Sequence, residues 1–307
     1  MTNKLDLTTV ILTYNEEKHI RRCIENMMPI SKRVILVDCF SKDKTKEIAE
    51  EMGAEVIEHA WPGNQSAQYN WFIDNVKVDT EWVIRRDADE YLLPELVEEL
   101  KERLPGLPED VTGIEFNRRH IFMGKWMKNG IYPIIFMRAY RNGCARYEER
   151  LMDEHLSLLK GRSVRFEHDF CDHSLMSLSE YCRKHVNYAE REAVELLDVE
   201  YNLSGLQDEG AAHKGGGQLG GQAESKHKRK LSYAKKPLFW RSFAYFCYRY
   251  FAKGSFLEGS AGFVFTFIQG WWYRTLVDAN IYEAKRECGD DKTKLKEYIA
   301  REWGITL

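Results

Sequence analysis

Short apolar runs alternate with helical patterns along the first 90 residues, and this alternation constrains the fold most. The strand-like runs lie at residues 8–14, 33–38, 55–58 and 82–84. Between the first two runs, Ile20, Cys23 and Ile24 recur at helical spacing, with Asn15 expected to cap that helix. Strands that alternate with helices form a mostly parallel sheet covered on both faces. The sequence therefore predicts a Rossmann-like α/β domain.

Polar residues follow three of these runs, at the point where each strand ends. They are Thr13, Tyr14, Asn15 and Glu16 after the first run, Asp38 and Ser41 after the second, and Asp87 and Asp89 after the fourth. The carboxyl ends of parallel strands meet at one edge of a sheet, where ligands bind. Each residue alone is more typical of a turn or a helix cap. Three clusters on one edge favour a nucleotide site.

The stretch from Arg85 to Asp89 (RRDAD) provides the most specific signal. Two aspartates at i and i+2 after a strand can direct oxygens toward one divalent cation, although a solvated acidic turn is the alternative. No glycine-rich phosphate loop follows the first strand. A metal bound to Asp89 is therefore the candidate for holding phosphates. Arg85 and Arg86 are adjacent on a strand, so at least one should be exposed or paired with a carboxylate.

Composition excludes several classes of protein. The chain has 307 residues, of which 44% are hydrophobic and 30% are charged. Its net charge of −3 lacks the excess of basic residues that is typical of nucleic-acid-binding proteins. Seven cysteines, none spaced C-x-x-C, indicate reduced thiols in a cytosolic setting. The start of the sequence shows no apolar signal-peptide core, and no uncharged run reaches the ~18 residues of a spanning helix.

The motifs TYNEE, VDCFSKDKT and RRDADEY, in this order, resemble glycosyltransferase family 2, inverting enzymes of the GT-A fold. Within the family, the chain is similar to bacterial lipopolysaccharide-core and cell-surface-polysaccharide enzymes of the β-1,4-glucosyltransferase type. The resemblance runs from about Thr8 to about Glu283. Two departures are the arginines before Asp87, where the family usually has an apolar residue, and Cys39-Phe40-Ser41, where it often has Ser-Gly-Ser.

The resemblance implies roles for individual residues. The implied donor-nucleotide contacts are Thr13, Tyr14, Asn15, Glu16, Asp38, Ser41, Asp87 and Arg86, with a local salt bridge as the alternative for Arg86. The implied ligands of Mn²⁺ or Mg²⁺ are Asp89, Asp87 and His173, with His168 a weaker rival to the histidine. The acceptor-binding candidates are Trp126, Tyr132 and Arg138. Inverting transfer also needs a carboxylate base, for which Glu154 is preferred and Asp153 is second.

The expected GT-A domain covers residues 1–175, and the sequence pattern changes after it. Ser177 and Glu180 fit a capping box before a long helix at 176–201. Residues 202–232 are rich in glycine and lysine and are expected to form a flexible linker. Residues 233–307 are helical in pattern, and their aromatic and basic residues suit the headgroup layer of a membrane. A helical subdomain packed on the sheet, or an oligomer contact, is the alternative.

These expectations combine into one hypothesis. The protein would transfer a hexose from a nucleotide sugar, with UDP as the favoured nucleotide, to a lipid-linked or cell-surface glycan. It would lie in the cytoplasm, peripherally on the inner face of the cytoplasmic membrane, with a homo-oligomer as a further option. A non-catalytic nucleotide-sugar-binding or membrane scaffold is one alternative. A sugar nucleotidyltransferase is another, disfavoured because TYNEE contains no glycine.

Overall fold

The computed structural model describes residues 4–148, 155–204 and 232–307. Within these limits the chain forms two compact units. Unit 1 comprises residues 4–126 and 132–175, and unit 2 comprises residues 127–131, 176–204 and 232–307.

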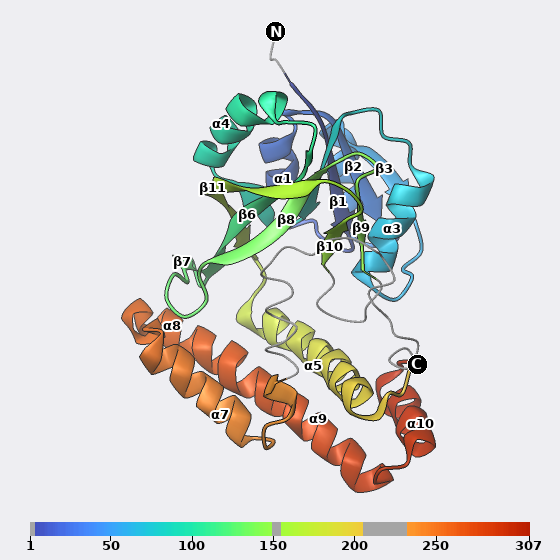
Figure 1. Ribbon diagram of the computed structural model, residues 1–307, viewed down its shortest axis with the longest axis vertical. Coiled ribbons are helices and arrows are strands. Elements are labelled where there is room, and N and C mark those ends of the chain that lie inside the picture. Colours follow the sequence, from blue (N-terminus) through green and yellow to red (C-terminus); the bar gives the residue numbers. More distant parts are fainter. Residues whose placement is uncertain (1–3, 149–154, 205–231) are drawn as a thin grey trace. The chain divides into compact units, whose positions relative to one another are not determined.

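Unit 1 is built on a mixed nine-stranded sheet in the order β3-β2-β1-β4-β8-β6-β11-β5, with β7 paired to β6 (Figure 1). Its strands are β1 (Leu5–Thr13), β2 (Ser31–Asp38), β3 (Glu55–Glu58), β4 (Trp82–Asp87), β5 (Glu90–Leu92), β6 (Val111–Phe122), β7 (Lys125–Trp126), β8 (Ile134–Arg141) and β11 (Arg162–His173). The first four in spatial order pair in parallel, and β8 joins β4 in antiparallel fashion. A separate hairpin pairs β9 (Ala145–Tyr147) with β10 (Leu156–Leu158). The predicted α/β fold with a helical C-terminal region is confirmed.

Side chains that alternate along β1 supply two cores, one on each face of the sheet. Ile11 belongs to the core that also contains buried residues of α1 (Ile20–Met27) and α4 (Pro94–Arg103). Its neighbour Val10 belongs to the core with Tyr69 and Phe72 of α3 (Gln65–Asn75). The remaining helix of this region is α2 (Thr45–Glu51). Helices therefore cover both faces, as the alternating pattern predicts.

The predicted cap of α1 is wrong. The helix begins at Ile20 with His19 in the N-cap position, whereas Asn15 lies four residues earlier with a left-handed φ of 55°. Its side-chain oxygen accepts a hydrogen bond from Lys42 N (2.8 Å) in the next loop. Asparagine tolerates the left-handed region because its short polar side chain can bond locally. The residue thus shapes the loop after β1 and does not start the helix.

Unit 2 consists of helices. They are α5 (Leu178–Tyr201), α7 (Trp240–Cys247), the π-helix η2 (Tyr248–Ala252), the short η3 (Ser255–Glu258), α8 (Gly259–Thr266), the π-helix η4 (Phe267–Trp272), α9 (Tyr273–Cys288) and α10 (Lys292–Trp303) (Figure 1). The capping box of Ser177 and Glu180 at the start of α5 is confirmed. Most of the predicted linker lies outside the described residues. Among the helices described, none has the length and apolar character needed to cross a bilayer.

Candidate active site

The register of the sheet brings the predicted strand-end residues together. Thr13 is paired with Asp38 across β1 and β2, and Leu12 is paired with Asp87 across β1 and β4. The chain leaves β1 toward β2 and later returns to β4 on the other side of β1. Such a reversal of strand order opens a crevice at the carboxyl ends of the strands. The predicted donor residues and the Asp87-Ala88-Asp89 turn therefore share this edge.

Asp38 joins the loops that follow β1 and β2. Its Oδ1 accepts hydrogen bonds from Thr13 Oγ1 (2.8 Å) and Ser41 Oγ (2.6 Å), and its Oδ2 accepts one from Ser41 N (2.7 Å). Ser41 Oγ in turn accepts a hydrogen bond from Asn15 N (2.8 Å). A carboxylate offers about four acceptor positions, so these contacts leave one on Oδ2. The fully buried Asp38 thus organises the loops, and its direct contact with a nucleotide stays a prediction.

The loop after β1 also fixes a histidine that sequence reasoning missed. Leu175 N donates to His19 Nε2 (2.8 Å), so this nitrogen carries no proton. His19 Nδ1 then donates to Glu16 Oε2 (2.6 Å), and Glu16 N donates to Thr45 Oγ1 (2.7 Å). The neutral imidazole thereby ties Glu16 to the end of the β11 segment. Tyr14, by contrast, is largely exposed, as an aromatic contact for a ligand requires.

Asp87 is held by two arginines. Arg138 Nη2 donates to its Oδ2 (2.8 Å), and Arg85 Nη2 donates to its Oδ1 (3.2 Å). Burial acts to raise the pKa of the Asp87 carboxyl, but the charges of Arg138 and Arg85 outweigh it and hold that pKa well below its usual value. Arg85 also donates to Gln65 Oε1 (2.8 Å). Asp87 is therefore an ionised, fixed carboxylate at the rim of the sheet where the parallel strands end.

A second carboxylate, Glu90, lies beneath Asp87 and was missed from the sequence. Its side chain is 2% exposed, whereas that of Asp87 is 32% exposed. Glu90 forms an ion pair with Arg138, and Arg86 Nη1 lies 3.7 Å from its Oε2. Glu90 Oε2 also accepts from Asp87 N (3.2 Å). The two acids and the guanidinium groups around them thus form one buried network, in which only Asp87 has a solvent-facing edge.

Two arginines that were predicted to contact ligands belong to this network. Arg138, expected at the acceptor, is buried beneath Asp87, and its guanidinium is engaged by Asp87 and Glu90. Arg86, expected at the donor phosphate, is fully buried with its guanidinium carbon 4.6 Å from the centre of the Phe170 ring. Both arginines pair with carboxylates, and their contacts with a ligand stay predictions. At least one of Arg85 and Arg86 was expected to be exposed or paired with a carboxylate. Both are paired, Arg85 with Asp87 and Arg86 with Glu90.

The second aspartate of the turn, Asp89, is held through its backbone. Its carbonyl oxygen accepts hydrogen bonds from His173 N (3.0 Å) and from Arg22 Nη2 (3.0 Å). Arg22 Nη1 lies 3.2 Å from His173 Nδ1, which accepts this hydrogen bond because the guanidinium can only donate. Burial lowers the pKa of His173, and the neighbouring Arg22 lowers it further. A neutral His173 therefore lies beside Asp89, with its Nδ1 already occupied.

These residues fit a metal that is bound mainly by its substrate. Among residues 4–148, 155–204 and 232–307, no cluster of three or more His, Cys, Asp or Glu side chains could hold a metal ion. Asp87 is already paired with two arginines, and Asp89 stays the predicted carboxylate ligand. Mg²⁺ and similar ions bind readily through one or two carboxylates, with phosphates and water completing the shell. The arrangement suits an ion that arrives with a diphosphate.

Two of the acceptor candidates lie together. The rings of Trp126 and Tyr132 meet edge to face with centroids 5.2 Å apart, and the Arg119 guanidinium carbon lies 4.3 Å from the Trp126 ring centre. Tyr132 Oη and Arg119 Nε donate to the two oxygens of Asp169 (3.2 and 2.6 Å). The pair is partly exposed, so it can present an aromatic surface. The base candidates Glu154 and Asp153 lie outside the described residues.

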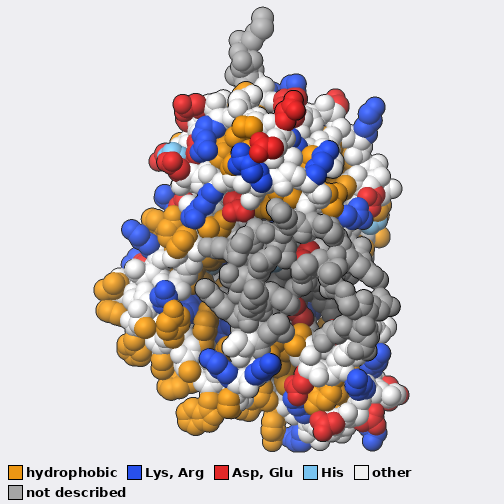
Figure 2. Space-filling view, viewed as in Figure 1, with side chains coloured by type: hydrophobic (Ala, Val, Ile, Leu, Met, Phe, Trp, Pro, Cys, Tyr) orange, Lys and Arg blue, Asp and Glu red, His pale blue; other side chains and the backbone are white. Residues whose placement is uncertain are grey.

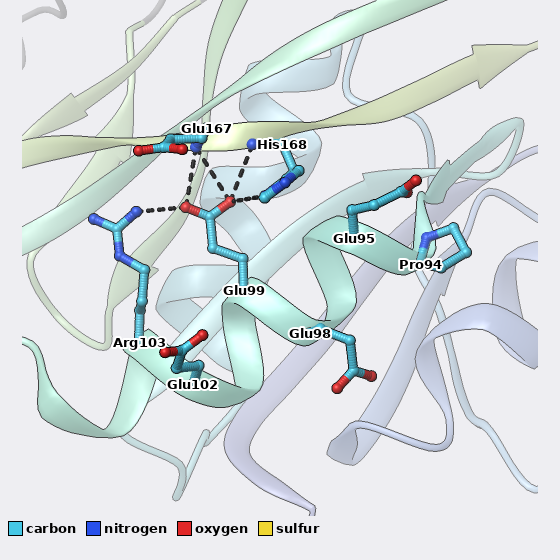
Figure 3. Close-up of a pocket in the computed structure, with 8 residues that line it drawn as sticks. All are labelled: Pro94, Glu95, Glu98, Glu99, Glu102, Arg103, Glu167 and His168. Carbon is cyan, nitrogen blue, oxygen red and sulfur yellow. Dashed lines mark hydrogen bonds and ion pairs between the residues drawn. The ribbon is translucent and has the colours of Figure 1, made fainter.

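A separate hollow of about 700 Å³ lies on α4 and β11, away from the strand ends (Figure 3). Its central carboxylate, Glu99, accepts hydrogen bonds from the backbone N–H groups of Glu167 and His168 and from His168 Nδ1, and it pairs with Arg103 (Figure 3). The register of β11 against β6 shifts between Arg165 and Asp169. Glu99 therefore satisfies the N–H groups of a bulge, a structural role. His168, the weaker metal candidate, is engaged there.

Comparison with known proteins identifies the class. The Glycosyl transferase family 2 model matches residues 8–171, more than half of the chain. The chain belongs to this family and is a glycosyltransferase.

Two of its relatives are described only as uncharacterized glycosyltransferases. An uncharacterized glycosyltransferase of Rickettsia bellii is 27% identical over 253 residues, covering 81% of this chain and 78% of that protein. Another from Rickettsia typhi is 39% identical over 95 residues, and the chain spans only 32% of that relative's length. Glucosyl-3-phosphoglycerate synthase from Mycobacterium tuberculosis aligns over 38% of this chain and 44% of that chain, with 20% identity and a TM-score of 0.31, too low to support a functional conclusion.

Proposed function

We propose that this glycosyltransferase transfers a hexose, with inversion, from a UDP-linked sugar to a lipid-linked or cell-surface glycan. The observation that supports the proposal most is the Asp87-Ala88-Asp89 turn at the point where strand order reverses. Asp87 is fixed there by two arginines, and Asp89 is fixed through its backbone. Two aspartates fixed in this way need little reorganisation of their own when a donor binds.

The donor would bind along the edge formed by β1, β2 and β4. Tyr14, Asn15 and Asp38 would surround the base and ribose, and Asp87 would face the ribose. Asp89 would hold Mn²⁺ or Mg²⁺ against the diphosphate, with His173 as a further ligand. When bound, such an ion offsets the negative charge of the leaving nucleotide. To bind the ion through Nε2, His173 would have to carry its proton on Nδ1. Arg22 would then have to release its hydrogen bond to Nδ1.

The protein's own acid–base work would come from Glu154 or Asp153. A carboxylate there would take the proton of the acceptor hydroxyl as its oxygen attacks the anomeric carbon from the face opposite the nucleotide. Trp126 and Tyr132 would offer the acceptor sugar an aromatic surface. Glu154→Gln and Asp153→Asn separate the two candidates: loss of kcat by about 100-fold or more, with the donor KM kept, identifies the base.

A membrane-linked acceptor is supported by a surface of unit 2, called the aromatic face below. Its exposed large side chains are Phe239, Trp240, Phe243, Tyr248, Phe251, Phe256, Leu257, Phe263 and Phe267. Trp240 is 74% exposed and Leu257 is 65% exposed. Figure 2 shows hydrophobic side chains gathered over the α7 and α8 region. Soluble monomers rarely expose so much contiguous apolar surface, and aromatic residues beside lysines suit a headgroup layer.

Nucleotide release from a panel of nucleotide sugars, with Mn²⁺ and a bacterial lipid extract as acceptor, tests the proposal. We expect release with a UDP-sugar that increases when the extract is added, and a loss of at least about 100-fold in Asp89→Asn. Absence of hydrolysis and transfer with every donor would instead favour the scaffold alternative. The control is Asp6→Asn, which removes an exposed pair between Asp6 of β1 and Lys32 of β2 and should retain full activity.

A further inference from the structure

Arg249 carries a buried charge for which the described part of the chain supplies no carboxylate partner. The residue lies in the π-helix η2 of unit 2 and is 4% exposed. Its Nε and Nη2 atoms donate no hydrogen bond within the described residues. Its guanidinium carbon lies 5.6 Å from the Tyr245 ring centre and 5.2 Å from that of Phe265. Ring contacts offset only part of the cost of burying a cation.

The groups that act most strongly on this charge are not acidic. They are Tyr245, Arg274 and Tyr181. The guanidinium carbon of Arg274 lies 4.3 Å from the centre of the Tyr245 ring, so both arginines contact this ring. Arg241, elsewhere in unit 2, is a buried arginine that is paired with a carboxylate, because its Nε donates to Asp278 Oδ1 at 2.7 Å. Arg249 has no such partner among the described residues. An anion from outside the chain would supply it.

A hydroxyl donor lies next to Arg249. Thr266 is fully buried, and its Oγ1 forms no hydrogen bond within the described residues. A Cβ placed on Gly270 would lie 3.6 Å from Thr266 Cγ2 and 3.8 Å from Arg249 Nη1, so both side chains lie close to this glycine. Gly270 lies in the second π-helix, η4. The wide turns of π-helices are frequent at functional sites.

The surrounding segment favours an anion. Residues 232–277 contain one carboxylate, Glu258. That side chain is buried and accepts hydrogen bonds from Asn129 N (3.0 Å) and Nδ2 (2.7 Å). The exposed charged side chains of the segment are Lys235, Lys236 and Lys253. The segment that contains the aromatic face is therefore positive wherever it carries an exposed charge, which complements anionic lipid headgroups.

We propose that Arg249 and Thr266 bind the phosphate group of an anionic lipid. The guanidinium would donate to two phosphate oxygens and the threonine hydroxyl to one, which satisfies the donors that the fold leaves unused. The side chains of the aromatic face would enter the headgroup layer around it. This inference rests on the membrane contact proposed above, and it adds a defined phosphate site to that contact.

Vesicle co-sedimentation tests the site. We expect the full chain to bind phosphatidylglycerol vesicles more tightly than phosphatidylcholine vesicles, and Arg249→Gln to weaken binding to the former by about tenfold. Thr266→Val should weaken it by about threefold, because a neutral donor is lost. The control Arg286→Gln makes the same charge change at an exposed position of α9 and should stay within about twofold.

Melting temperature separates a binding role from a structural one. Because Arg249 Nε and Nη2 and Thr266 Oγ1 donate no hydrogen bond among the described residues, Arg249→Gln and Thr266→Val should melt at or above the wild-type temperature without lipid. A marked fall in either variant would mean that the side chain is structural, and the proposal would be wrong.

The source of the phosphate and the membrane contact are tested separately. Inorganic pyrophosphate that stabilises the wild type but not Arg249→Gln, without any effect of this variant on vesicle binding, would overturn the lipid source in favour of a soluble phosphate. If the wild type binds no vesicle, the proposed membrane contact fails. If Arg249→Gln binds phosphatidylglycerol like the wild type, only the phosphate site fails.

Discussion

Arg138 Nη2 donates a hydrogen bond to Asp87 Oδ2 at 2.8 Å, although Arg138 lies on β8, 51 positions after Asp87 in the sequence. The same guanidinium pairs with the buried Glu90. One side chain of β8 therefore fixes both the rim carboxylate and the acid beneath it. The geometry of the Asp87-Ala88-Asp89 turn depends on this contact.

Replacing Arg138 by methionine should destabilise unit 1 strongly. The change leaves Glu90 buried beside Arg86 alone, at 3.7 Å, and removes one of the two arginine partners of Asp87. Losing one partner of a buried ion pair costs about 3–5 kcal/mol, whereas an exposed pair contributes about 0–1 kcal/mol. Urea unfolding of Arg138→Met measures the loss. The control is Arg162→Met, in an exposed pair with Asp110 (2.7 Å), and equal effects in the two variants would contradict the network.

Asp172 should give unit 1 a pH-dependent stability. Burial acts to raise the pKa of Asp172, but Arg118 Nη1 (3.1 Å) and His120 Nδ1 (3.2 Å) hold that pKa below its usual value of 3.8. Because the folded-state pKa is lowered, the stabilisation is complete above 3.8 and is lost as the pH falls toward the folded-state pKa.

The variant Asp172→Asn isolates this contribution. Its free energy of unfolding at neutral pH should be about 1–3 kcal/mol below that of the wild type. The two proteins should converge in acid, once the Asp172 carboxyl is protonated in both states, which chemical denaturation at a series of pH values will follow. A difference that stays constant down to the acid limit would show that the charge of Asp172 is not the cause.

Glu99 should matter for stability and not for donor binding. Glu99→Gln replaces one acceptor of the bulge N–H groups of Glu167 and His168 by an NH₂ group, with an expected loss of about 2–3 kcal/mol. The donor KM should be unchanged, since the hollow of Figure 3 is separate from the strand ends. Glu98→Gln, with a side chain that is 72% exposed, is the matched control and should change stability by about 0.5 kcal/mol or less. A raised KM with normal stability would reverse this assignment.

Local sequence patterns were sufficient to predict the framework of the site. The strand at 55–58 was predicted with the observed bounds, and the register then placed Thr13, Asp38 and Asp87 at one edge as expected. These predictions depend on short-range periodicity and on a general property of parallel sheets. The same is true of the capping box at the start of α5.

Long-range pairing explains what the sequence did not reveal. Nothing near Arg138 indicates that β8 inserts antiparallel beside β4, and only that pairing brings Arg138 to Asp87. The roles of Glu90 and Glu99 depend equally on contacts with distant strands. Asn15 was misread because an asparagine before a helical pattern is usually a cap, whereas here it takes a left-handed turn toward the next loop.

Titration of UDP against the wild type and Asp89→Asn, each with Mn²⁺ and with EDTA, tests the central claim most directly. If Asp89 holds an ion that arrives with the diphosphate, Mn²⁺ should tighten UDP binding to the wild type by about tenfold or more, and the variant should lose this gain. Equal Kd values for the wild type with Mn²⁺ and with EDTA, or an undiminished gain in Asp89→Asn, would contradict the account.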